Sequence, residues 1–198
     1  MLIEKIYYTD GACKGNPGPG GFGVINLNEY QVRKRDQWGN WTTDHYETIV
    51  DYKYSEYCEH TTNNREELKA ILHVFRLAAA DKNNKYIIYS DSAYAVNMIN
   101  SWINNWAKNN WCNSKNKEVE NIDLVKELYN YLNIDFFNCQ VRKVDGHANV
   151  PGNELADALA TNDLNKFEKE LKKNNIVDNQ KKLLYNINNK ILKGEYNE

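Results

Sequence analysis

The segment "YTDGACKGNPGPGGFGV", Tyr8–Val24, decides the fold because it puts an acid and a glycine-rich run directly after an apolar strand. Six of the chain's ten glycines and two of its three prolines lie between Gly11 and Gly23. A phosphate-binding loop or a dinucleotide fingerprint would open a helix, whereas these glycines lead into the strand-like "GFGVINL". The segment therefore predicts two strands with a tight connection. On this segment alone, Asp10 is equally well explained as a turn residue.

Length and composition indicate one domain with an extension. The chain has 198 residues, 41% of them apolar and 12% aromatic, which is enough for a core. The net charge of −2 does not mark a nucleic-acid-binding protein, although acids that hold metal ions would mask such a surface. No run is long enough to span a membrane, and the N-terminus lacks a signal-peptide pattern. Four cysteines without a C-x-x-C pair argue against structural zinc and fit the cytoplasm.

Hydrophobic periodicity predicts an α/β domain over residues 1–162, with a mixed five-stranded sheet flanked by helices. Within it, residues 28–60 form an extended hairpin whose turn is "DQWGNW". Residues 163–198 form a Lys/Asn-rich C-terminal extension, in which Leu184, Ile187 and Ile191 could share one apolar stripe. The other strands are predicted over 2–12, 20–27, 85–91 and 134–144, and the helices over 61–80, 92–110, 121–132 and 153–161.

Four acids occupy positions that suit a metal site better than a core. Asp10 and Asp91 each end an apolar strand, so both lie at one sheet edge if the strands are neighbours. Periodicity places Glu67 on the buried face of its helix and Glu66 on the more polar side. Asp157 shares a small, apolar helix face and lies too deep in the helix to be a cap.

Four carboxylates that converge would repel one another unless cations lie between them. Oxygen ligands suit Mg²⁺ or Mn²⁺ rather than zinc. Two such ions about 3.5–4 Å apart form the usual clamp for in-line phosphoryl displacement. The acids therefore predict two Mg²⁺ ions, with Mn²⁺ as a substitute.

Five motifs, in order, resemble those of type 1 ribonuclease H: "YTDGACKGNPGPGGFGV", "TTNNREEL", "YSDSAY", "SWINNW" and "DGHANVPGNELADALA". The resemblance covers Met1 to Thr161 and implies the ribonuclease H-like fold. It implies an endonuclease that cleaves the RNA strand of RNA–DNA hybrids, leaving 5′-phosphate and 3′-hydroxyl ends. The implied metal ligands are Asp10, which bridges both ions, Asp157 on the side of the attacking water, and Glu67 and Asp91 on the side of the leaving oxygen.

The resemblance also implies residues that contact the hybrid. The glycines would let the backbone approach its minor groove, and His147 would assist proton transfer or product release. One departure is His60, where the family often has an arginine beside the phosphate pocket. The implied contacts are Cys13, Asn16, Asn63 and Asn64 in the minor groove, Trp102 and Trp106 on the DNA strand, and Thr62 and Asn121 at a DNA phosphate.

Two other functions remain open from the sequence. One is a hybrid-binding module that has lost its chemistry, against which four intact carboxylates argue. The other is a ribonuclease H unit that works beside a reverse transcriptase. Because the chain starts at its first strand and contains no polymerase, we expect a free enzyme. We also expect a monomer whose partner is the RNA–DNA hybrid and not a membrane.

Overall fold

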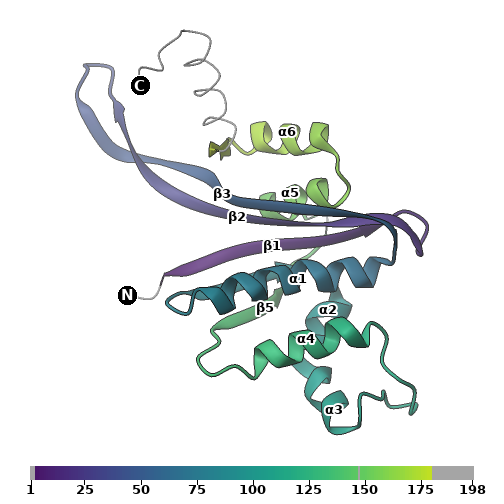
Figure 1. Ribbon diagram of the computed structural model, residues 1–198. Helices are drawn as coiled ribbons and strands as arrows, with labels where there is room; N and C mark the ends of the chain where they lie inside the picture. Colours follow the sequence, from purple (N-terminus) through teal and green to yellow (C-terminus); the bar gives the residue numbers. More distant parts are fainter. Residues whose placement is uncertain (1–2, 147, 180–198) are drawn as a thin grey trace, which may run out of the picture.

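The computed structural model describes residues 3–146 and 148–179, in which one mixed sheet carries helices on both faces (Figure 1). The sheet order is β5-β4-β1-β2-β3-β6, with β1 antiparallel to β2 and parallel to β4. The predicted mixed α/β fold is confirmed, and a short sixth strand adds to the five expected. The strands are β1 Glu4–Cys13, β2 Gly18–Arg35, β3 Trp41–Thr61, β4 Lys85–Ser90, β5 Cys139–Lys143 and β6 Val177–Asp178.

Helices of two groups bury the two faces of the sheet (Figure 1). The first group covers the face that carries Phe22, Val24 and Ile88. It consists of α1 Asn63–Ala80, α2 Ala93–Asn97, a π-helical turn Met98–Trp102, α3 Ile103–Lys108 and α4 Ile122–Leu132. The second group, α5 Pro151–Ala160 and α6 Leu164–Lys173, covers the face that carries Ile25 and Val50.

Two glycines bring helices unusually close to the sheet. A Cβ on Gly11 would lie 2.2 Å from the backbone nitrogen of Glu67, so the first turn of α1 lies directly on β1. A Cβ on Gly23 would lie 2.2 Å from the carbonyl oxygen of Ala156 in α5. Glycine is required wherever backbones approach this closely. These two glycines therefore allow close helix packing inside the protein, and the expected approach of this backbone to a substrate stays a prediction.

The hairpin of β2 and β3 projects beyond the helical layers (Figure 1). Its strands pair from Gly18↔Thr61 to Arg35↔Trp41. Asp36 closes the turn, since its carboxylate accepts hydrogen bonds from the backbone nitrogens of Trp38 at 2.9 Å and of Asn40 at 2.8 Å.

The described part of the C-terminal extension packs on the sheet. Phe167 and Leu171 of α6 share a buried cluster with Val50, and β6 pairs with β3 through Val177. The domain boundary after residue 162 stays a prediction, but residues 164–178 contribute to the same core. The expected stripe of Leu184, Ile187 and Ile191 lies outside the described residues.

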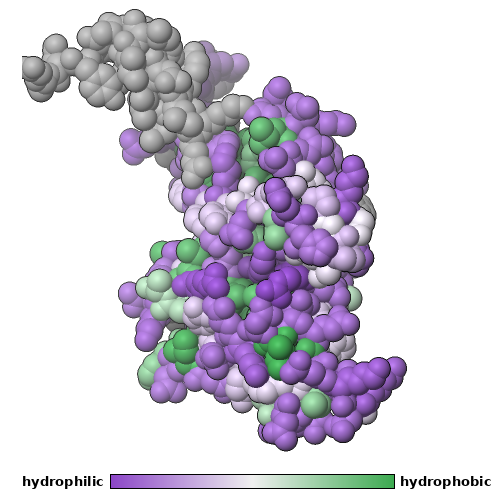
Figure 2. Space-filling view, turned by 45° about the vertical axis from the view of Figure 1, so that its right-hand side comes forward, coloured by the Kyte–Doolittle hydropathy of each residue, from purple (hydrophilic) through white to green (hydrophobic). Residues whose placement is uncertain are grey.

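The surface seen in Figure 2 is mostly hydrophilic, with small separate apolar areas.

Strand β5 begins at Cys139, later than the start of the predicted strand 134–144, and Phe136, which precedes β5, is exposed. None of the helices among residues 3–146 and 148–179 is apolar and long enough to cross a bilayer.

Candidate active site

Three of the four acids meet at one edge of the sheet. Asp10 follows Thr9 on β1, which pairs with Ser90, the last residue of β4, so Asp91 lies beside Asp10 where β4 ends. The structure corrects one expectation here, because β1 continues past Asp10 to Cys13 by pairing with β2. Glu67 joins them from the first turn of α1. One carboxylate oxygen from each acid lies within 4.8 Å of the other two. Asp10 and Glu67 are buried, and Asp91 is partly exposed.

The surrounding backbone holds this cluster closely. Asn153 of α5 is buried and donates a hydrogen bond from Nδ2 to Asp91 Oδ2 at 3.1 Å. A Cβ on Gly146 would lie 3.0 Å from the same oxygen. Two buried atoms beside the cluster, Glu67 Oε2 and Asn153 Oδ1, lack a partner among the described residues. Acceptors without donors are costly in a protein interior, and they suit a cation or its water ligands.

Burial and mutual repulsion make Asp10 and Glu67 hard to ionise. Burial raises the pKa of Asp10 to about 8, with further contributions from the charges of Asp91 and Asp157. Burial also raises the pKa of Glu67 well above its usual value, followed by repulsion from Asp10 and Asp91. Such shifts are typical of functional sites, because evolution rarely retains unpaired buried acids for stability.

Glu66 corrects one expectation from the sequence. Periodicity places it on a polar side of α1, yet its side chain is fully buried. It accepts a hydrogen bond from Thr61 Oγ1 at 2.5 Å and pairs with Lys69 Nζ at 2.9 Å. The end of β3 covers this side of the helix, which helical periodicity alone does not reveal. Of the two neighbouring acids, only Glu67 belongs to the acidic cluster.

Asp157 lines the same cavity but is held differently. The cavity has a volume of about 280 Å³ and is lined by the three clustered acids together with Asn153, Glu154 and Asp157. The Asp157 carboxylate forms an ion pair with Lys166 of α6, which also lies 3.1 Å from Glu154. The structure thus brings the fourth predicted acid to the cavity and pairs it with a lysine.

Several predicted substrate contacts lie beside the acids. Cys13 and Asn63 line the cavity that holds the acids. Asn16 Oδ1 accepts a hydrogen bond from the backbone nitrogen of Asn63 at 3.0 Å, which joins the β1–β2 connection to the start of α1. Thr62 caps this helix, and Asn64 is partly exposed next to it.

Arg65 is a neighbour of the predicted phosphate pocket that sequence reasoning missed. Its Nη1 donates to Asn121 Oδ1 at 3.3 Å, and its guanidinium pairs with Asp123. Thr62 and Asn121 are therefore linked through Arg65, whose backbone nitrogen donates to Thr62 Oγ1 at 3.4 Å. His60 is exposed at the end of β3. The signal available in the sequence was an arginine three residues after the cap.

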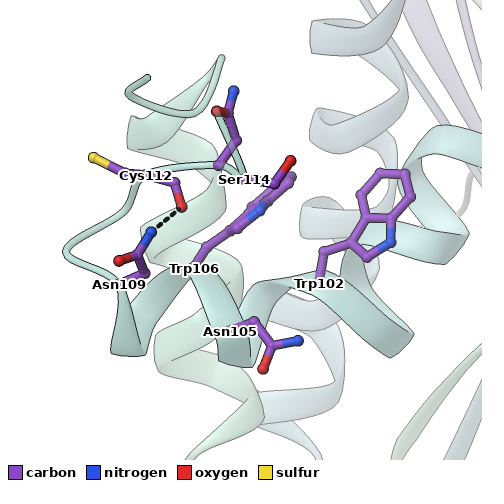
Figure 3. Close-up of a pocket in the computed structure, with 7 residues that line it drawn as sticks. Trp102, Asn105, Trp106, Asn109, Cys112 and Ser114 are labelled. Carbon is purple, nitrogen blue, oxygen red and sulfur yellow. Dashed lines mark hydrogen bonds between the residues drawn. The ribbon is translucent and has the colours of Figure 1, made fainter. Parts of the chain in front are cut away.

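Trp102, at the end of the π-helical turn, and Trp106, in α3, form a second surface feature. The rings of Trp102 and Trp106 have centroids 5.7 Å apart and line a groove of about 470 Å³ (Figure 3). Asn109 closes one side by donating to the carbonyl oxygen of Cys112 at 3.1 Å, as the dashed line in Figure 3 shows. Trp102 is 37% exposed, enough to offer a ring face.

Comparison with known proteins identifies the family. The family model described as RNase H matches residues 4–165. The chain belongs to the RNase H family. It is 41% identical over 160 residues to "Ribonuclease H" of Caldicellulosiruptor saccharolyticus, with 80% of this chain and 94% of that protein covered. It is also 41% identical over 160 residues to "Ribonuclease HI" of Rickettsia conorii, with 81% and 90% covered.

Solved RNase H structures share the fold. LC9-RNase H1, described as a type 1 RNase H with the type 2 active-site motif, has a TM-score of 0.59 and 27% identity over 81% of this chain and 71% of that chain. The RNase H domain of PFV has a TM-score of 0.62 at 21% identity, over 81% of this chain and 93% of that chain, and supports the fold alone. An RNase H is a nuclease, so the chain is a hydrolase.

The acids of this RNase H fit a divalent cation. All the candidate metal ligands in the cluster are carboxylate oxygens. One carboxylate oxygen there, Glu67 Oε2, is buried without a partner among the described residues. Oxygen ligands of this kind suit hard cations such as Mg²⁺ and Mn²⁺. Family membership and this cluster together indicate a divalent metal. His147, the remaining predicted catalytic residue, lies outside the described residues.

Proposed function

We propose that this chain hydrolyses the RNA strand of RNA–DNA hybrids with two divalent cations, leaving 5′-phosphate and 3′-hydroxyl ends. The observation that carries the proposal is the convergence of Asp10, Glu67 and Asp91 in a cavity that Asp157 also lines. Paired cations held by such carboxylates stabilise both the attacking and the leaving oxygen of a phosphoryl transfer. Mg²⁺ is the ion we assign, and Mn²⁺ is a substitute.

We assign the four acids the roles that the family implies. Asp10 would contact both ions. Asp157 would hold the ion on the side of the attacking water, and Glu67 and Asp91 the ion on the leaving side. Asn153 orients Asp91 through its hydrogen bond. We assign His147 the assisting role in proton transfer or product release that the family implies.

The hybrid would lie across the cavity and the helices beside it. Cys13, Asn16 and Asn63 carry short polar groups at the cavity rim, where they can contact a 2′-hydroxyl, the group that distinguishes RNA from DNA. Other contacts are Asn64 on the same helix, Thr62 and Asn121 for a DNA phosphate, and Trp102 and Trp106 for stacking on the DNA strand. LC11-RNase H1, whose structure contains an RNA/DNA hybrid, shares the fold with a TM-score of 0.54 and 22% identity over 82% of this chain and 97% of that chain.

The direct test is a cleavage assay on a duplex with one labelled RNA strand. With Mg²⁺, we expect RNA fragments that end in 3′-hydroxyls, and with EDTA we expect none. Double-stranded DNA of the same sequence is the matched control. Binding of the hybrid without cleavage in Mg²⁺ or Mn²⁺ would favour a binding module instead, and this would contradict the proposal.

We also propose that the chain acts as a monomer in the cytoplasm. Four free cysteines fit a reducing compartment. Light scattering of the purified protein tests the monomer, for which we expect a mass near 23.1 kDa. A mass twice as large would overturn this part of the proposal.

A further inference from the structure

Lys166 joins two acids of the catalytic cavity. Its ammonium group pairs with the carboxylate of Asp157 and lies 3.1 Å from Glu154 Oε2. Among residues 3–146 and 148–179, no other lysine or arginine forms an ion pair with an acid that lines this cavity. The clustered acids Asp10, Glu67 and Asp91 have no such partner within this part of the chain.

Helix α6 fixes the lysine in place. Lys166 lies one residue beyond the region that matches the family. Its backbone nitrogen donates at 2.8 Å to the carboxylate of Asp163, which caps the helix. Phe167 and Leu171 of the same helix are buried against Leu155 and neighbouring residues. The lysine is thus presented by a packed helix.

We propose that Lys166 is an internal cation that neutralises Asp157 in the metal-free enzyme and competes with a divalent cation for that carboxylate. This inference rests on the proposed function, because it concerns the ion assigned to Asp157. Lys166 is a positioning residue: it acts on the metal site through Asp157.

The consequence is a difference in affinity between the two ions. The cluster of Asp10, Glu67 and Asp91 offers oxygens that no lysine of the described residues occupies, so a first cation binds there without displacing one. A cation at Asp157 must share the carboxylate with Lys166 or displace its ammonium. A lysine carries a compact, hydrated charge on a flexible stem, so displacement into solvent is feasible. Through Lys166, helix α6 therefore sets the concentration of divalent cation that is needed to fill the site at Asp157.

A purely structural role makes a different prediction. If Lys166 only ties α6 to α5, its removal lowers the stability of the fold without changing the affinity for cations. If it competes for Asp157, its removal tightens the binding of a cation. The two roles are separated by measuring metal binding directly, without substrate.

The experiment is a calorimetric titration of the purified full chain with Mn²⁺. The relevant binding step is the one that Asp157→Asn removes. In Lys166→Gln, we expect this step to tighten about threefold, the scale set by a partly exposed ion pair. In Lys166→Arg, we expect it to weaken about threefold, since arginine can hold a carboxylate through two hydrogen bonds. Lys169→Gln is the matched control, because it removes the same charge from an exposed position of the same helix.

Each result decides the inference. An unchanged step in both Lys166 variants, or an equal shift in Lys169→Gln, would overturn it. Thermal denaturation shows whether Lys166→Gln folds, and if it does not, the opposite shift in Lys166→Arg remains the test. A wild-type protein that cleaves hybrids with Mg²⁺ but shows no step sensitive to Asp157→Asn would refute only this inference. A protein that binds no divalent cation and cleaves nothing would refute the proposed function as well.

Discussion

Acids at the two ends of strands β1 and β4 have opposite environments, which shift their pKa values in opposite directions. At the amino end, Asp81 Oδ2 accepts hydrogen bonds from Lys5 Nζ at 2.7 Å, Asn84 at 2.8 Å and the Tyr86 hydroxyl at 3.1 Å. The hydrogen bond from Lys5 is the main cause that lowers the pKa of Asp81 below its usual range. At the carboxyl end, burial and neighbouring acids raise the pKa of Asp10 to about 8. An acid paired with a lysine stabilises the fold, whereas clustered acids without a basic partner among the described residues mark a site for an external cation.

Asp91→Asn should give the largest effect, because it removes a proposed metal ligand from the acidic cluster at the carboxyl end. We expect the rate of hybrid cleavage to fall roughly a thousandfold or more, since metal ligands contribute several kcal/mol to the transition state. The fold should persist, as an amide can still bond to Asn153. Single-turnover cleavage with saturating Mg²⁺ checks the rate, and circular dichroism checks the fold. Substantial turnover by the variant would remove Asp91 from the site.

The variants Glu67→Gln and Glu66→Gln compare, on one helix, an acid of the cluster with an acid that is paired with a lysine. We expect Glu67→Gln to lower the cleavage rate by about a hundredfold, because one metal ligand loses its charge. Glu66→Gln should stay close to the wild-type rate but lose about 1 kcal/mol of stability, since Thr61 and Lys69 lose a charged acceptor. Cleavage assays and urea denaturation of both variants provide the measurements. A reversed order of the two rates would show that Glu66 belongs to the site.

The opposite pKa shifts of Asp10 and Asp81 predict how the stability of the metal-free protein depends on pH. Because the pKa of Asp10 rises from 3.8 to about 8 on folding, the folded chain binds more protons than the unfolded chain between these values. Stability should therefore fall as pH rises from 5 to 7, by about 1 kcal/mol per pH unit. Asp81 contributes nothing in this range, since its lowered pKa acts only in more acidic solution.

Urea denaturation in EDTA checks this pH dependence. Glu67, whose pKa burial also raises, contributes to the decline. Asp10→Asn should reduce the decline, because the variant loses the proton of Asp10 and the repulsion that Asp10 exerts on Glu67. The difference between the two proteins cancels the opposing contribution of His73, whose pKa burial lowers. Parallel curves for wild type and Asp10→Asn would contradict the assignment of the proton to Asp10.

Asp81→Asn should have the smallest effect. It removes the charge that pairs with Lys5 at the amino end, and the pair is partly exposed. We expect a loss of about 1 kcal/mol in the free energy of unfolding, with unchanged cleavage. Asp81 and the catalytic acids lie at opposite ends of the strands, so a marked fall in the cleavage rate of this variant would show that the two ends are coupled.

The sequence predicted the parts of the site that local patterns encode. Acids that end apolar strands, such as Asp10 and Asp91, are visible as breaks in a hydrophobic run. Glu67 follows from helical periodicity once the buried face is known. The mixed sheet follows from the order of strands and helices, because a strand that returns after a helix favours parallel pairing.

The parts that the sequence did not predict depend on contacts between distant segments. Glu66 is buried because Thr61 covers it, and periodicity assumes that a helix packs on one side only. Lys166 reaches Asp157 from another helix, so no local motif contains both residues. The segment 164–178 has a polar composition, and its few apolar residues, such as Phe167, become informative only once their partner surface is known.

The long hairpin has a consequence for local opening of the structure. From Leu27 to Trp41, no residue is buried, so this outer part of the hairpin has pairing but no apolar layer to hold it. Segments with few buried contacts open at low free energy, whereas core strands exchange only on global unfolding. Amide hydrogens of the outer hairpin should therefore exchange with deuterium long before those of Phe22 and Val24 on the same strand. One strand thus spans two levels of stability, and its tip can fray while its base still supports the sheet beside the acidic cluster.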